Sequence, residues 1–179
     1  MRKTVVGLLV ACVVVVAAVG VAAAREHLAV ATLVDVVRAS TERFHDPERA
    51  VAEGWGSAGS CVSGPQEGAM GIHYVKGTIL FDGALDAEQP EALIYESKNG
   101  ALRLVGVEFI VIADEWHATN AGPPVLMGQH FHYVGSPNRY GLPPFYELHV
   151  WAWRENPNGM FVDWNPKVSC ADVEGEAHH

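Results

Sequence analysis

The stretch LRLVGVEFIVIA, Leu102 to Ala113, decides the fold because it predicts a β-strand that is buried on both faces. Side chains along a strand alternate between the two faces of its sheet, and from Leu104 onward both sets are apolar except for Glu108. An isolated buried carboxylate is very costly unless it is paired, protonated or bound to a metal. The partner of Glu108 is therefore the first thing to look for in the rest of the sequence.

The segments around this strand predict an α+β fold. Asn99-Gly100 joins it to a second apolar run, residues 92–96, and this dipeptide between two apolar runs is the strongest short hairpin signal. Three further strands are predicted, over residues 71–76, 125–134 and 145–153. Helices come before the strands, so we expect N-terminal helices followed by a mainly antiparallel sheet, which becomes a small open barrel if the sheet curls.

Two helices are predicted at the N-terminal side of the sheet. Apolar residues at loosely helical spacing predict the first over residues 26–44. The second is short: Asp46 is suited to the N-cap, Pro47 to the first helical position and Gly54 to the C-terminal stop.

Residues 1–24 have the pattern of an export signal. Arg2 and Lys3 precede a long uncharged apolar run, and three alanines ending at Ala24 suit cleavage by signal peptidase. The alternative is an uncleaved anchor, because about 20 apolar residues are enough to cross a bilayer. We therefore expect a single α+β domain over residues 25–179 that is periplasmic or extracellular and contacts a membrane only through an uncleaved N-terminal segment.

The charge of the exported part disfavours polyanionic partners. Without Arg2 and Lys3, 10 of the 12 lysines and arginines remain against 21 acidic residues, a formal net charge of −11. Such a surface repels phosphate backbones and anionic lipid, so we expect no nucleic-acid partner.

Two cysteines remain in the exported part, Cys61 and Cys170. In an oxidising compartment the simplest prediction is one disulfide between them. The alternative is that both bind a metal, although neither lies in a CxxC or CxH spacing.

Two histidines lie in the middle of predicted strands, as Glu108 does. His73 is in GIHYV, and His149 is in FYELHVWAW, on the same predicted face as Glu147 and two tryptophans. Taken singly, each histidine fits an ordinary core position, and Glu108 fits an ion pair with Arg103, Arg139 or Arg154. Taken together, imidazole and carboxylate groups are the usual ligands of a divalent transition metal, which would also neutralise the buried Glu108.

A second histidine pattern occurs in GQHFH. His130 and His132 would lie on one face of the strand predicted over residues 125–134, so either is a candidate fourth ligand. No acid follows the pair at the spacing of cupin barrels, so a cupin is not predicted. Asp163, in FVDWNP, is a candidate acceptor for the second ring nitrogen of a ligand histidine.

Several blocks of the chain resemble an uncharacterised family of exported bacterial proteins. They are GAMGIHYV (68–75), DGALD (82–86), PEALIYE (90–96), LRLVGVEFIV (102–111), LHVWAW (148–153) and NPNGMFVDWNPKVSC (156–170). The resemblance covers most of the exported part, from Phe44 to Cys170. It implies the same grouping of His73, Glu108 and His149 and a role for both cysteines, with a single histidine near the GQHF segment instead of a pair.

The sequence thus predicts an exported metal-binding domain with a mononuclear site at His73, Glu108 and His149. Iron, zinc and copper all suit such ligands, and three protein ligands with open positions suit a catalytic centre, whereas a filled fourth position suits a structural or storage site. The prediction covers both an enzyme acting on a small molecule and a non-catalytic protein. Two alternatives remain: a metal-free binding protein for a small organic ligand or sugar, and a purely structural domain.

Overall fold

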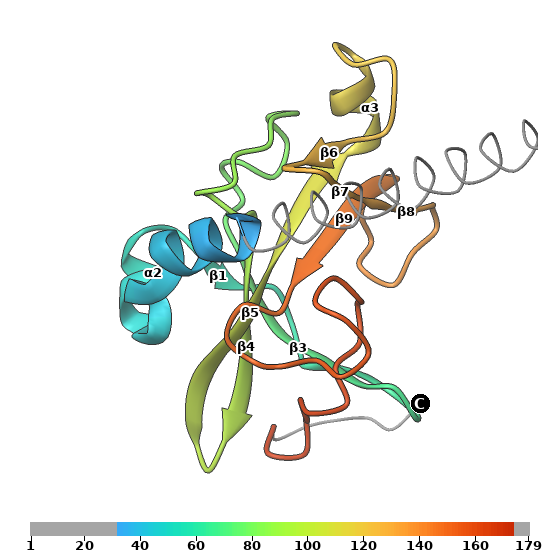
Figure 1. Ribbon diagram of the computed structural model, residues 1–179. Helices are drawn as coiled ribbons and strands as arrows, with labels where there is room; N and C mark the ends of the chain where they lie inside the picture. The colour runs from blue at the N-terminus through green and yellow to red at the C-terminus, as the bar shows by residue number, and fades with distance from the viewer. Residues whose placement is uncertain (1–31, 174–179) are drawn as a thin grey trace, which may run out of the picture.

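The central strand of the sheet is β5 (Ala101–Ile112), the longest strand in the computed structural model, which describes residues 32–173 (Figure 1). Every residue from Leu104 to Ile112 is buried, as the apolar pattern on both faces predicted. Ala113 does not extend the strand but begins the short helix α3 (Ala113–His117).

Asn99 and Gly100 connect β5 to β4 (Ala92–Lys98) in the predicted hairpin. Their φ angles are 53° and 76°, and two positive φ values in a two-residue loop are typical of a type I′ turn. The hairpin prediction is therefore confirmed.

The remaining strands are short and mostly pair with their neighbours in antiparallel register. They are β1 (Gly56–Ser57), β2 (Val62–Gly64), β3 (Gly68–Val75), β6 (Val125–Leu126), β7 (Gln129–His130), β8 (His132–Val134) and β9 (Phe145–Val150). The main sheet has the order β1-β3-β4-β5-β9-β8, with β2 paired to β3, and all its pairs are antiparallel. The fold is α+β with a mainly antiparallel sheet, as predicted, but the sheet stays open and is not closed into a barrel.

Few helices accompany the sheet. Residues 32–41 are helical, and the 3₁₀ helix η1 (Glu42–His45) and α2 (Pro47–Ala52) follow. The Asp46 side chain caps α2 by accepting a hydrogen bond from the Glu48 backbone N–H. The part of the first predicted helix over residues 26–31 lies outside the described residues.

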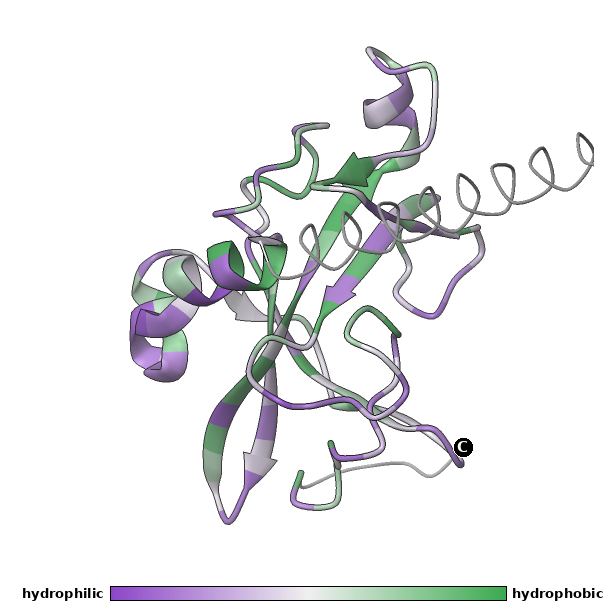
Figure 2. Cartoon of the chain, viewed as in Figure 1, coloured by the Kyte–Doolittle hydropathy of each residue, from purple (hydrophilic) through white to green (hydrophobic). Residues whose placement is uncertain are grey.

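The two faces of the sheet are covered differently. Leu93, Val107 and Leu148 belong to the main core, which Leu33 and Val37 of the N-terminal helix complete. The opposite face carries two smaller apolar clusters. One contains Ile94, Val105 and Trp151 around the disulfide, and the other contains Ala92, Ile110 and Phe145. Figure 2 shows that β9 alternates between hydrophobic and hydrophilic residues.

The prediction of one continuous strand over residues 125–134 is wrong, because a turn divides this segment into short strands. Met127 and Gly128 have φ angles of 49° and 88° and form a tight turn between β6 and β7. After this turn only β8 joins the main sheet, where it pairs with β9.

The strand predicted over residues 145–153 ends at Val150, so Trp151 and Trp153 do not share a strand face. Trp151 is buried in the cluster around the disulfide, and Trp153 packs against the main core and donates a hydrogen bond to Thr41. Both tryptophans therefore serve packing and offer no exposed platform for a sugar.

Cys61 and Cys170 form the predicted disulfide, with a Cα–Cα distance of 5.6 Å across 109 residues of chain. The disulfide excludes the alternative that the two cysteines bind a metal. Within residues 32–173 no helix is both long and apolar enough to cross a membrane. The predicted signal segment, residues 1–24, lies outside the described residues.

Candidate metal centre

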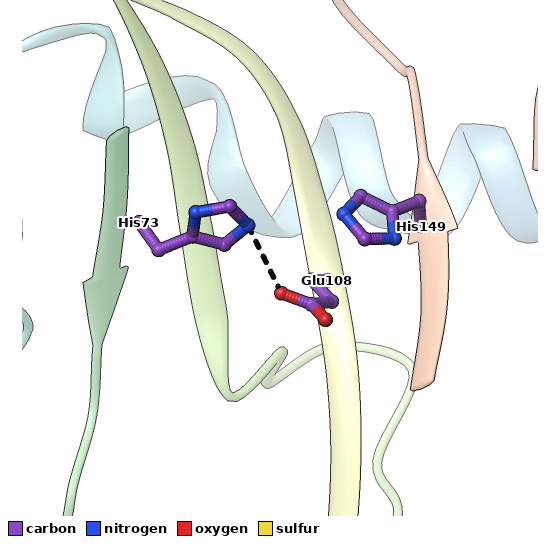
Figure 3. Close-up of side chains that lie close together, drawn as sticks. All are labelled: His73, Glu108 and His149. Carbon is purple, nitrogen blue, oxygen red and sulfur yellow. Dashed lines mark ion pairs between the residues drawn. The ribbon is translucent and has the colours of Figure 1, made fainter. Parts of the chain in front are cut away.

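The sheet register brings Glu108 and His149 together. The two residues are directly opposite each other on β5 and β9, and Ala92 of β4 lies opposite Glu108 on the other side. Ala92 carries only a methyl group, so the longer side chain of His73 on β3 reaches over β4 toward Glu108. Figure 3 shows the two imidazole rings on either side of the Glu108 carboxylate.

The three donor groups are close and shielded from solvent. His73 Nε2 lies 3.2 Å from Glu108 Oε2, and one ligand atom from each of His73, Glu108 and His149 falls within 4.8 Å of the others. His149 is completely buried, and the other two side chains are about one-tenth exposed or less. Bonds of about 2.1 Å to one tetrahedral metal place donors roughly 3.4 Å apart, so this spacing suits a single ion after small side-chain shifts.

The charges in the cluster are strongly coupled. Burial by itself would raise the pKa of Glu108, but the positive charge of His149 and the contact with His73 outweigh it and lower the pKa to about 2. Burial likewise opposes protonation of His149, yet the Glu108 carboxylate and Asp163 raise the pKa of this imidazole. Each group thus favours the charged form of the other.

Two more acids border His149 on its other side. Asp163 Oδ1 lies 3.5 Å from His149 Nδ1 and 3.1 Å from His132 Nδ1. Glu147 is buried two residues before His149, and burial together with the negative charge of Glu108 raises the pKa of Glu147 to about 10. Glu147, His149 and Asp163 also place one ligand atom each within 4.8 Å of one another.

Unsatisfied polar atoms are confined to this region. Among residues 32–173, the buried side-chain nitrogens and oxygens without a hydrogen-bond partner are His73 Nε2, Glu147 Oε2 and both ring nitrogens of His149. Native structures pair the large majority of such atoms, and an unpaired one costs about 1–3 kcal/mol. Four in one cluster indicate that the site is built to hold something.

A cavity of about 470 Å³ opens on one side of the cluster. His73 and Glu108 line it together with apolar residues such as Ile110 and Phe145, and Arg139 and Tyr140 also contribute to its wall. The volume lies in the range of small-molecule sites.

The alternative of an arginine partner for Glu108 is wrong. Arg154 pairs with Glu96 instead, and Arg103 is exposed. Arg139 lines the cavity but forms no ion pair with Glu108. Because the register places Glu108 opposite His149 and within reach of His73, the carboxylate faces imidazoles.

The structure does not bring His130 and His132 into the group around Glu108. The turn at Met127-Gly128 and the end of β7 divide the predicted strand, so His130 lies exposed on β7. His132 lies on β8 with 60% of its side chain exposed, and it reaches only Asp163. Asp163 lies beside His149 Nδ1, where the sequence suggested an acceptor for a ligand histidine.

Besides Glu96, which pairs with Arg154, sequence reasoning missed two buried acids. Glu147 was placed on the face of His149 but not joined to Asp163, although its mid-strand position in FYELHV is the same signal that identified Glu108. Glu91 precedes β4, and its Oε2 accepts the Ile110 N–H at 2.8 Å in place of a strand carbonyl. Burial raises the pKa of Glu91 to about 8.

Comparison with protein-family models, with curated proteins and with solved structures gave no match. The resemblance to exported bacterial proteins therefore stays a prediction, and inferences about function start from the geometry of the site.

Proposed function

We propose that the protein is an exported metal-binding protein that holds one divalent transition metal ion at His73, Glu108 and His149. The observation that carries the proposal is the convergence of three buried ligand groups, in which Nε2 of His73 and both ring nitrogens of the fully buried His149 have no hydrogen bond. A bound ion would occupy these donors and offset the buried Glu108 charge.

Two imidazoles and one carboxylate suit iron, zinc or copper, and they leave coordination positions open. His73 and Glu108 line the cavity, so a small molecule in it would reach the ion. A metalloenzyme acting on a small substrate therefore fits this site better than a closed structural site does. The disulfide supports the exported location, because such bonds persist in oxidising compartments.

The test is metal content after export. The chain is produced with export to an oxidising compartment, stripped with a chelator and loaded separately with Zn²⁺, Fe²⁺ or Cu²⁺. We expect stoichiometric binding of at least one of these ions, measured by elemental analysis, and its loss from the His73–Glu108 site in His73→Ala and Glu108→Gln. His130→Ala is the matched control, because this exposed histidine is outside the cluster and its loss should change nothing. A wild-type protein that stays metal-free in all three loadings contradicts the proposal.

A second candidate function is a metal-free binding protein, which the 470 Å³ cavity favours. In that case Glu108 would hydrogen-bond a small organic ligand directly. A thermal-shift screen of the metal-free protein distinguishes the two: ligands that stabilise it without added metal support the second candidate.

A further inference from the structure

Both ring nitrogens of His149 lack a hydrogen bond, and one metal ion would bind only one of them. A histidine that binds a metal through one ring nitrogen almost always donates the N–H of the other to an acceptor. Asp163 Oδ1 lies 3.5 Å from Nδ1 in an ion pair, but the contact does not form a hydrogen bond. The other nitrogen lies on the side of Glu108 and His73 (Figure 3). Both nitrogens of this fully buried ring thus lack a hydrogen bond.

The groups around Nδ1 form a second set of ligands. Glu147 is only 4% exposed and its Oε2 has no hydrogen-bond partner, and Asp163 is three-quarters buried. Ligand atoms of Glu147, His149 and Asp163 lie within 4.8 Å of one another, as those of the first set also do. His132 Nδ1, 3.1 Å from Asp163 Oδ1, brings another imidazole to the solvent side.

The acids around His149 also lack basic side-chain partners. Glu108, Glu147 and Asp163 surround a single imidazole, and among the ion pairs of the described residues none joins a lysine or arginine to any of them. Cations bound on both sides of His149 would take the place that the Arg154 guanidinium fills beside Glu96.

We propose that His149 bridges two metal ions, one held with His73 and Glu108 and the other held with Glu147 and Asp163. The inference rests on the metal centre proposed above and adds a second site to it. In forming the bridge, a neutral His149 releases one proton, and Glu147 releases its proton if it is protonated. Each ion gains three protein ligands, with His149 shared between them.

Zinc stoichiometry measured by native mass spectrometry tests the bridge. The metal-free full chain is titrated with Zn²⁺ alone, and we expect two ions per wild-type chain. Glu147→Gln and Asp163→Asn should each bind one ion, His73→Ala and Glu108→Gln should also bind one, and His149→Ala should bind neither. The His149→Ala variant keeps His178-His179 and therefore gives the baseline for adventitious binding by these terminal histidines. Glu155→Gln, at an exposed acid paired with Lys167, is the control that should keep both ions.

The possible results separate the two proposals. One ion in the wild type that persists in Glu147→Gln and Asp163→Asn overturns the bridge and leaves the first site standing. No ion in the wild type overturns both. One ion that is lost in Glu147→Gln but kept in His73→Ala places the metal on the Nδ1 side and also overturns the bridge.

Electron paramagnetic resonance distinguishes a bridging His149 from a His149 that only supports the fold. In the Cu²⁺-loaded protein, an imidazolate bridge couples the two ions magnetically and weakens the electron paramagnetic resonance signal per copper. We expect Glu147→Gln to restore the full signal of an isolated Cu²⁺ ion. A full-intensity signal from two-copper wild-type protein would overturn the bridge.

Discussion

Two buried carboxylates on neighbouring strands, Glu96 on β4 and Glu108 on β5, have opposite surroundings. Glu96 accepts the Ser169 N–H at 3.1 Å through one oxygen and pairs with the Arg154 guanidinium through the other. Glu108 faces two imidazoles whose buried nitrogens have no hydrogen-bond partner. Both carboxylates are less than 5% exposed, so burial does not distinguish them. The completeness of the hydrogen bonds does: Glu96 belongs to a finished structural pair, and Glu108 belongs to the cluster that we propose a metal ion completes.

The largest expected effect is a loss of stability when the ion pair between Glu96 and Arg154 is removed. Glu96→Ala leaves the Ser169 N–H and the Arg154 guanidinium without their acceptor, so the free energy of unfolding should fall by about 3 kcal/mol. Urea denaturation of the metal-free protein measures this loss. Metal stoichiometry should not change, because Glu96 is outside the cluster. Loss of bound metal in a folded Glu96→Ala protein would show that the two regions are coupled.

The next prediction concerns how the stability of the metal-free protein and of the metal-bound protein depends on pH. The raised pKa of Glu147, about 10, means that its contribution to stability is full below its ordinary value of 4.5 and is lost as pH rises toward 10. The raised pKa of His149 acts in the same direction above 6.5. We therefore expect the metal-free protein to become less stable from pH 5 to pH 8.

Metal binding should have the opposite slope, because a metal ion competes with protons for the same atoms. An ion that binds only the folded state, at 100 times its dissociation constant, adds about 2.7 kcal/mol to stability. At a fixed metal concentration this gain should grow from pH 5 to pH 8, because the dissociation constant falls as protons leave the ligands. Thermal unfolding with and without Zn²⁺ at several pH values measures both slopes. A gain from Zn²⁺ that does not change with pH would argue against histidine ligands.

The smallest effect is expected at Glu91, another buried carboxylate. In Glu91→Gln the amide oxygen still accepts the Ile110 N–H, so stability should change by about 1 kcal/mol or less at pH 5, where the buried Glu91 carboxyl is still protonated. Burial raises the pKa of Glu91 to about 8, so its own contribution declines as pH rises from 4.5 toward 8. The variant should therefore lose stability less steeply than wild type over this range, as urea denaturation at pH 5 and pH 8 can show. An identical slope in both proteins would contradict this assignment.

Local patterns predicted the parts of the fold that depend on neighbouring residues. Asn99-Gly100 predicted its hairpin because two positive φ values at such a turn strongly favour this pair. The unbroken apolar run predicted that β5 is buried on both faces. The strand over residues 125–134 was wrong because the turn at Met127-Gly128 places a methionine at positive φ, which has no strong sequence signal.

Patterns within single strands also predicted part of the candidate site. A charged or titratable group in the middle of an apolar strand identified His73, Glu108 and His149, which the structure brings together. The same signal was present for Glu147. Its link to Asp163 was not readable, because Asp163 lies in an irregular segment after β9 and reaches His149 only through the folded chain.

The sequence by itself determined that Glu108 is buried and that Cys61 and Cys170 pair, because an apolar strand and two cysteines outside the predicted export signal leave few alternatives. Only the tertiary structure decided which groups face Glu108. Strand register sets this choice, since His149 lies directly opposite Glu108 and Ala92 leaves room for His73. Register depends on contacts between residues far apart in the chain. The pattern within one strand therefore shows that Glu108 needs a partner, but it does not show which residue the partner is.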